Sequence, residues 1–411
     1  MLLQGPPGPF FKRLQLYLED NGHDVWRVVF NPADRFFSNR HGRVNFYGDL
    51  GEWENWFSDF IEGAGIDHVI LFGAERPAHR IARSIAAEQG IDVVSLEEGY
   101  IRPGYVTVER GGNNASSPLA GALPLAGLNY EEQPDFPAED FKGFEPMCFQ
   151  NAVHYTVRAL FSFGKQKAMF HREVPLFPEI FFWLRSTWRR WTKQTLNFTT
   201  IQNLLEHHDG NYYLVPLQVD SDSQLRGAAL GWSTLKLISA TLKSFARHAP
   251  PGKRLVFKIH PLERGRSNHA SLIPNMARAF GIEDRVDVVD TGSLGLLTRH
   301  CAGMITINST SGLSALHHGV PLLVVGAAFY AVPELAVIGN GHPDFDSFWH
   351  SRHVADKRTR HAYLRWVKHE ALVMGDFYAA KGVHAACQNI LLKLAEYRRA
   401  EKTEMEARSA C

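Results

Sequence analysis

Short apolar runs alternate with amphipathic stretches along most of the chain. In the first half, apolar runs lie at 1–3, 25–30, 67–73 and 92–96, with helical patterns at 14–21 and 78–89. Strands that alternate with helices are typical of an α/β fold with a parallel, doubly wound sheet. The first half therefore predicts a Rossmann-like domain.

The same alternation returns after residue 205. It predicts strands at 211–217, 254–259, 286–289, 302–307 and 321–326, and helices at 234–248, 271–280, 294–300 and 313–318. We predict a second Rossmann-like domain that faces the first across a cleft, where ligands usually bind. The expected domains are 1–205, 206–375 and a helical C-terminal tail, 376–411.

Two stretches of the first domain break the pattern. Residues 119–144 are rich in Pro, Gly and Ala, which predicts a long loop or flap. Residues 150–195 interleave aromatic side chains with Lys and Arg on helical spacings, which is typical of a helix at a membrane interface. The same mixture also suits a helical hairpin packed on the domain, with its arginines extended along the surface.

Composition narrows the class of protein. With 45% hydrophobic residues, 21% charged residues and a net charge of +1, the chain has no polybasic run, so we expect no nucleic-acid partner. The four cysteines follow neither a zinc nor a disulfide spacing. No signal peptide and no long apolar stretch is visible. We therefore expect a cytoplasmic protein without a structural metal.

Cationic and hydroxyl residues follow two of the predicted strands in the second half. Lys258, His260 and Pro261 come directly after the run 254–257. Asn308, Ser309, Thr310, Ser311 and Gly312 stand between a strand and a helix. Helix N-termini carry unpaired N–H groups and partial positive charge, so together these residues predict a nucleotide-phosphate site.

Carboxylates stand at two further strand ends. Glu97 and Glu98 precede Gly99, and two adjacent carboxylates in a partly dry site would leave one protonated, so Glu98 is a candidate general acid. Alternatively, one Glu caps a turn and the other pairs with Arg102. Asp220 and Asp222 follow Gln218 and could act on a reacting sugar carbon, cap a turn, or hold Mg²⁺.

The N-terminal loop is glycine-rich. Gln4, Gly5 and Gly8 lie between a strand and a helix, where the backbone could approach a substrate closely. The spacing is neither G-x-G-x-x-G nor a Walker motif, so a rigid turn explains the loop equally well.

Together these motifs resemble the capsule polysaccharide biosynthesis and export proteins of Gram-negative bacteria, and in particular their shorter, S-type (KpsS/LipB-like) group. The resemblance covers nearly the whole chain. It rests on Gln4-Gly5-Pro6 with Gly8-Pro9-Phe10-Phe11, Phe30-Asn31 with Asp34-Arg35, Glu97 to Pro103, Gln218-Val219 with Asp222-Ser223, Lys258 with His260-Pro261, and Asn308 to Gly312.

The resemblance implies a GT-B-like retaining β-Kdo glycosyltransferase. It would take Kdo from CMP-Kdo and add the first β-Kdo to lysophosphatidylglycerol at the inner face of the inner membrane, beside other capsule biosynthesis and export proteins. Carried over by position, Asp222 rather than Asp220 is the nucleophile, Glu98 acts on the acceptor, and His260 stabilises the departing cytidylate. Because CMP has a single phosphate, we expect no metal cofactor.

Other functions remain open on the sequence. The same domains could belong to a non-catalytic export or assembly subunit, a CMP-sialic acid transferase, or an epimerase-like protein that binds a UDP-sugar. Fold analogy does not separate them.

Overall fold

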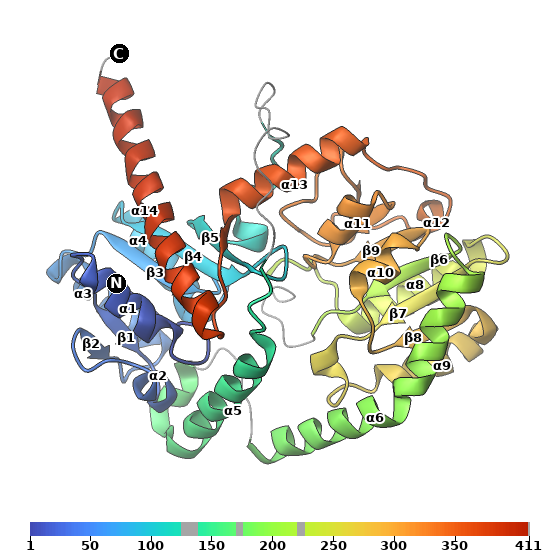
Figure 1. Ribbon diagram of the computed structural model, residues 1–411, viewed down its shortest axis with the longest axis horizontal. Coiled ribbons are helices and arrows are strands. Elements are labelled where there is room, and N and C mark those ends of the chain that lie inside the picture. The colour runs from blue at the N-terminus through green and yellow to red at the C-terminus, as the bar shows by residue number, and fades with distance from the viewer. Residues whose placement is uncertain (125–138, 170–175, 220–226, 410–411) are drawn as a thin grey trace. The chain divides into compact units, whose positions relative to one another are not determined.

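The computed structural model describes residues 1–124, 139–169, 176–219 and 227–409, and it divides into two compact units (Figure 1). The first unit combines Met1–Pro118 and Pro134–Leu176 with Val367–Cys411. The second combines Leu119–Gln133 with Phe177–Trp366. The α/β class predicted from the alternating pattern is confirmed in both units.

The sheet of the first unit is parallel in its centre and antiparallel at one edge. Leu2 pairs in parallel with Arg27 and Ile70, so the N-terminal segment lies between two strands. The strands of this sheet are Arg27–Val29 (β1), Arg43–Asn45 (β2), His68–Phe72 (β3), Asp92–Glu98 (β4), Tyr105–Arg110 (β5) and Leu372–Met374 (β12). The N-terminal segment joins the pair β2-β1 to the other four strands, which follow in the order β3-β4-β5-β12. β5 is antiparallel to β4, and β12 is antiparallel to β5, so the expectation of a wholly parallel sheet is wrong at this edge.

Helices of the first unit cover both faces of this sheet. They are Phe10–Asp20 (α1), Pro32–Phe36 (α2), Leu50–Gly63 (α3), Pro77–Glu88 (α4) and Ala380–Ser409 (α14), with a short 3-10 turn at Asn114–Ser116 (η1). Successive strand residues point to opposite faces. Val69 and Leu71 therefore pack in one apolar cluster with α3 and α4, whereas Ile70 and Phe72 pack in another with α1 and α14.

The second unit contains a six-stranded sheet that is parallel throughout. The strands are Tyr212–Pro216 (β6), Arg254–Lys258 (β7), Val286–Val289 (β8), Gly303–Thr306 (β9), Leu322–Val324 (β10) and Val337–Ile338 (β11). Their order is β11-β10-β9-β6-β7-β8. Chain order therefore reverses between β6 and β9, as in a Rossmann fold, and ligands bind beyond the carboxyl ends of the strands at such a switch point.

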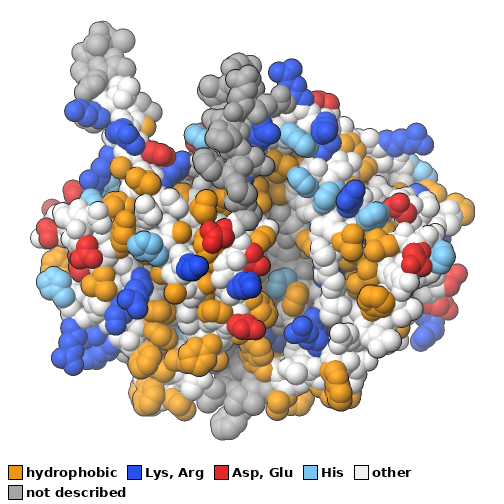
Figure 2. Space-filling model, in the orientation of Figure 1, with side chains coloured by type: hydrophobic (Ala, Val, Ile, Leu, Met, Phe, Trp, Pro, Cys, Tyr) orange, Lys and Arg blue, Asp and Glu red, His pale blue; other side chains and the backbone are white. Residues whose placement is uncertain are grey.

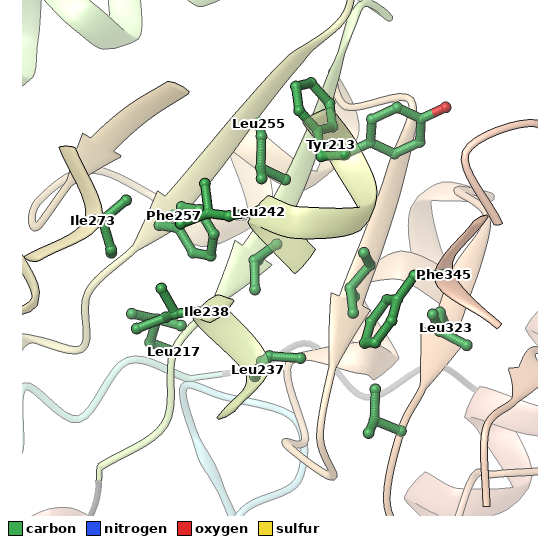
Figure 3. Close-up of a cluster of buried hydrophobic side chains, with 14 of the residues drawn as sticks. Tyr213, Leu217, Leu237, Ile238, Leu242, Leu255, Phe257, Ile273, Leu323 and Phe345 are labelled. Atoms are coloured by element: carbon green, nitrogen blue, oxygen red, sulfur yellow. The ribbon is translucent and has the colours of Figure 1, made fainter. Parts of the chain in front are cut away.

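Helices and turns complete the second unit. They are Thr234–His248 (α8), Pro261–Glu263 (η3), His269–Ala279 (α9), Glu283–Arg285 (η4), Leu294–Arg299 (α10), Gly312–His318 (α11) and Phe345–Phe348 (α12). Alternate residues of β6 and β7 bury Tyr213, Leu255 and Phe257 against Leu242 and neighbouring residues of α8 (Figure 3). The apolar pattern that predicted these strands and helices thus forms the core.

The aromatic and basic segment is helical, as predicted, but it is divided. It consists of Phe144–Phe161 (α5), a 3-10 stretch at Gly164–Met169 (η2) and the long helix Leu176–His207 (α6). A further helix, Lys357–Ala371 (α13), spans the boundary between the units along the chain. Within the described ranges, none of the helices combines the length and apolarity that crossing a bilayer requires.

Candidate active site

An amide pair occupies the switch point of the second unit. Gln218 follows β6 and Asn308 follows β9, the two strands between which chain order reverses. Gln218 Nε2 donates to Asn308 Oδ1 at 2.9 Å, and the Asn308 N–H donates to Gln218 Oε1 at 3.3 Å. Both side chains are buried, so the pair links the ends of β6 and β9 at the edge where a ligand is expected.

The hydroxyl residues form a tight turn that leads into α11. The Ser311 N–H donates to Ser309 Oγ at 3.2 Å, and Tyr330 OH donates to Ser309 O. Ser311 Oγ is buried without a hydrogen-bond partner. A side chain on Gly312 would collide with the Tyr330 ring, so glycine is required there. Ser309, Thr310 and Ser311 are themselves half-buried at the end of β9.

The Lys258 ammonium lies at the end of the neighbouring strand β7. Its Nζ donates to Thr291 O at 3.1 Å, and burial lowers the pKa of Lys258 to about 8, against the opposing effect of Asp290. A bound anion would favour the charged form and reverse this shift. The phosphate-binding role of Lys258 stays a prediction, and its buried ammonium at a strand end is compatible with it.

His260 differs from the cationic donor suggested by the sequence. The Leu262 N–H donates to His260 Nδ1 at 3.2 Å, so this nitrogen is an acceptor that caps η3, and Pro261 is the first residue of that turn. A proton on the imidazole therefore sits on Nε2, which is the atom that could donate to a phosphate. Asp222, the nucleophile that the resemblance implies, and its alternative Asp220 lie outside the described residues.

A second polar cluster occupies the switch point of the first unit. The N-terminal segment, which lies between β1 and β3, ends at Gln4, and Gln4 Nε2 donates to the Asp34 carboxylate at 3.0 Å. Arg76 Nη1 donates to Gln4 Oε1 at 3.0 Å and to Gly5 O at 3.2 Å. Burial raises the pKa of Asp34, while the charge of Arg27 and the hydrogen bond from Gln4 oppose the rise. In the sequence, Asp34 was notable only as part of a motif shared with the family, and nothing there pointed to Arg76.

The two glycines of the N-terminal loop are explained by packing. A side chain on Gly5 would collide with the Phe11 ring, and one on Gly8 would collide with the Gln150 amide. Gly8 also has φ near +115°, which favours glycine. The rigid-turn interpretation therefore explains both glycines, and the close approach of a substrate to this loop stays a prediction.

Glu97 and Glu98 do not form the carboxylate pair that the sequence suggested. Both belong to β4, and neighbouring residues of a strand point to opposite faces of the sheet. Glu97 interacts electrostatically with Arg76, whereas Glu98 is near Arg102, Asp376 and Tyr378. The pKa of Glu98 is raised chiefly by burial and also by Asp376, against the effects of Arg102 and a hydrogen bond from Tyr378. Glu98 therefore remains a candidate acid or base, for a different reason.

Two residues near Glu98 come from the far end of the sequence. Asp376 accepts the N–H groups of Tyr378 and Ala379 at 2.7 and 2.6 Å and so shapes the turn before α14. Gln150 Nε2 donates to Tyr378 O at 3.1 Å. Arg102 Nε donates to Gly99 O at 3.0 Å, and a side chain on Gly99 would collide with Tyr105 O. No signal in the sequence linked residues 376–378 to Glu98.

A buried carboxylate lies further along the same sheet. Glu109 on β5 accepts hydrogen bonds from Tyr100 OH and Ser117 Oγ, and it is 2% exposed. Burial raises the pKa of Glu109 to about 7. Because its oxygens are used by these two hydroxyls, we assign Glu109 to the folded framework rather than to the reaction.

A metal site is not formed by the residues that the structure describes. Among them, no group of three or more His, Cys, Asp or Glu is arranged to hold a metal ion. The Asp-Ser-Asp stretch at 220–222, which the sequence offered for Mg²⁺, lies outside those residues.

Comparisons with known proteins point to one family. Residues 67–378 match the family described as "Capsule polysaccharide biosynthesis protein". The Escherichia coli capsule polysaccharide export protein KpsS is 33% identical over 85% of this chain and 89% of its own length. The capsule polysaccharide modification protein LipB of Neisseria meningitidis serogroup A is 32% identical over 92% of this chain and 91% of its own.

Solved structures show weaker likenesses. A Thermosulfurimonas dismutans KpsC structure, named as a β-Kdo 2,4 transferase, has a TM-score of 0.43 and 17% identity, covering 88% of this chain and 89% of its own. UDP-GlcNAc 2-epimerase from Methanocaldococcus jannaschii has a TM-score of 0.28 and 12% identity, covering 90% and 99%. Likenesses at this level carry no information about substrate.

Proposed function

Because the chain belongs to the capsule polysaccharide biosynthesis protein family, we propose that it is a glycosyltransferase that adds the first β-Kdo of the capsule linker to lysophosphatidylglycerol, with CMP-Kdo as donor. The observation that carries the proposal is the Rossmann switch point of the second unit, where Gln218 and Asn308 pair beside the buried Lys258. Such sites bind nucleotides. The family relationship and the names of the relatives support the capsule context.

In the proposed donor site, the second unit binds the cytidylate. Lys258 provides a positive charge for the single phosphate, His260 Nε2–H donates to it, and the turn Ser309–Ser311 offers hydroxyl and N–H groups. A lysine whose pKa is lowered to about 8 by burial gains stabilisation when an anion arrives. One phosphate can leave with this help, so the proposal requires no metal.

The proposed reaction retains configuration through two displacements. In the first step, the Asp222 carboxylate bonds to the anomeric carbon of Kdo, and the bond to CMP breaks with its electron pair leaving on the phosphate. In the second step, the acceptor hydroxyl attacks the same carbon and releases Asp222, while Glu98 takes the hydroxyl proton. The direction of the pKa shift of Glu98 supports this assignment, because a carboxylate whose pKa is raised accepts a proton more readily.

The test is transfer by the purified protein from CMP-Kdo to a fluorescent lysophosphatidylglycerol in detergent micelles. We expect a product one Kdo heavier, loss of at least about a thousandfold in Asp222→Asn, and near-normal activity in the matched Asp220→Asn. Activity in Asp222→Asn with loss in Asp220→Asn would move the nucleophile. Failure of the wild-type protein to transfer Kdo, with intact donor, would reject the enzyme.

The name of the E. coli relative, an export protein, supports a second candidate. In that case the chain would bind lipid-linked capsule polymer without catalysis, at the inner face of the inner membrane and beside other capsule proteins. A melting experiment separates the candidates, because an enzyme for CMP-Kdo is stabilised by CMP. Stabilisation by UDP instead would favour a UDP-sugar enzyme.

A further inference from the structure

The long helix α6 has one face fixed to the second unit. Arg189 Nη1 donates to Arg264 O at 2.7 Å and to Ser267 O at 3.0 Å, and Arg185 Nη2 donates to Asn268 Oδ1 at 2.7 Å. Asn197 exchanges hydrogen bonds with Asp290, at 2.8 and 3.1 Å. Two of the arginines expected to meet lipid are therefore engaged with the protein. The packed face is defined by these residues.

The opposite face of α6 carries large apolar side chains that contact solvent. Leu184, Trp188, Trp191 and Phe198 follow each other at intervals of four, three and seven residues, which places them on one face of a helix. Their exposed fractions are 67%, 63%, 78% and 68%. We call these four residues the α6 stripe. Hydrophobic side chains show along the lower edge of the space-filling view, where α6 runs (Figure 2).

Three threonines around the stripe have hydroxyls that are already satisfied by the helix. Thr187 Oγ1 donates to Trp183 O at 3.0 Å, Thr192 Oγ1 to Trp188 O at 2.9 Å, and Thr199 Oγ1 to Thr195 O at 3.0 Å. Bonds back to the carbonyl four residues earlier let a hydroxyl enter an apolar medium without an unpaired donor. This face can therefore leave water at low cost.

The charge of α6 complements an anionic surface. Between Glu179 and Glu206 the sequence has no acidic residue, whereas it has four cations. Arg190 is exposed on the flank of α6, between the stripe and the packed face. Trp prefers the interfacial zone of a bilayer, and a helix with an apolar face and nearby cations lies in the plane of that zone. The four cations and the lack of carboxylates between Glu179 and Glu206 favour an anionic surface as the occupant of this face.

We propose that the α6 stripe inserts into the interfacial zone of an anionic lipid bilayer and so anchors the second unit to the membrane surface. The use of such an anchor rests on the proposed function, because a transferase with a lipid acceptor would meet that acceptor at the bilayer surface. The contact itself follows from the surface of α6. It assigns the apolar side chains, and Arg190, to the lipid, and Arg185 and Arg189 to the protein.

Sedimentation with phosphatidylcholine vesicles that contain phosphatidylglycerol tests the proposal on the full chain. Trp188→Ser/Trp191→Ser should weaken vesicle binding by about tenfold or more, because two ring systems no longer leave water. For single changes, Leu184→Ser should weaken binding and the matched Leu235→Ser should not, since Leu235 is an exposed leucine of α8 in the same unit, 52% exposed. Arg190→Gln should cost roughly fivefold on anionic vesicles and little on neutral ones.

Two outcomes would overturn the inference. One is unchanged vesicle binding in the double variant. The other is that light scattering finds an oligomer for the wild-type protein and a monomer for the double variant, while both bind vesicles equally. In that case a second copy of the chain would cover the stripe. Transfer to acceptor in detergent micelles is measured in parallel. Vesicle binding without transfer would reject the proposed function alone, and normal micelle transfer without vesicle binding would reject the anchor alone.

Discussion

Single residues near the candidate active site owe their chemistry to their surroundings. The sequence placed Glu97 and Glu98 together, but strand alternation separates their side chains. The pKa of Glu98 is changed by burial, by Arg102 four positions later, and by Asp376 and Tyr378, which lie almost three hundred positions later. Local pattern cannot supply such partners, because long-range proximity is set by the fold. The place of Lys258 at the end of β7 was predicted correctly because a strand end is defined locally, whereas its role in binding phosphate stays a prediction.

Tyr378→Phe should lower Kdo transfer by about tenfold. The phenol donates a hydrogen bond that favours the ionised Glu98 and lowers the pKa of that carboxyl, so its loss raises this pKa further. The acidic limb of the pH–rate profile should then move to higher pH. Tyr397→Phe is the matched control, since Tyr397 lies on α14 and its OH donates to Val108 O at 3.1 Å. An unchanged pH profile in Tyr378→Phe would show that the tyrosine only supports the fold.

Glu109 should make the stability of the protein depend on pH. Its pKa is raised from 4.5 to about 7 by burial, so the folded state binds a proton more tightly than the unfolded state. This stabilisation is present below pH about 4.5 and is lost as pH rises to about 7, a change of about 3 kcal/mol in the free energy of unfolding. Glu109→Gln should remove it.

Chemical denaturation at several pH values measures the effect. Relative to wild type, Glu109→Gln should gain stability between pH 5 and pH 8, while the exposed Glu54→Gln on α3 should not. Parallel pH curves for wild type and Glu109→Gln would contradict the assignment.

At the scale of elements, the spacing of apolar residues predicted most strands and helices of the second unit. The predicted helix at 234–248 is α8, and the strands predicted at 254–259 and 286–289 are β7 and β8, each within one residue. Strands buried on both faces leave a continuous apolar run, which is easy to recognise. β5 and β12 were missed in the first unit. β12 has only three residues, and its position is set by pairing with β5 rather than by its own pattern.

Only one face of α14 should contribute strongly to the stability of the first unit. Ile390 is fully buried in the cluster that contains Phe10, Phe11 and Phe377. Ile390→Ala should lower the free energy of unfolding by about 2–4 kcal/mol, since it leaves a cavity. Leu392 on the same helix is 55% exposed, so Leu392→Ala should cost less than about 0.5 kcal/mol. Denaturant titrations compare the two, and equal losses would mean that α14 packs differently.

At the scale of the whole molecule, the two units are built from the chain in different ways. The strands and helices from α8 to α12 all lie within one continuous stretch, Phe177–Trp366. The first unit interrupts itself, and its sheet and one apolar face are completed only by β12 and α14. The alternation of apolar runs and amphipathic stretches predicts both sheets, but it does not indicate which helix packs on which unit. That assignment depends on contacts between residues far apart in the chain.

This discontinuity sets an order for folding during protein synthesis. The strands β1, β3 and β4 leave the ribosome first, yet Phe10 and Phe11 wait for Phe377 and Ile390 before their cluster can close. The second unit meanwhile has every strand it needs once residue 366 has emerged. Domains usually fold in the order in which they are made. Here the unit that is made first is completed last, so its apolar face stays open until Phe377 and Ile390 have been made.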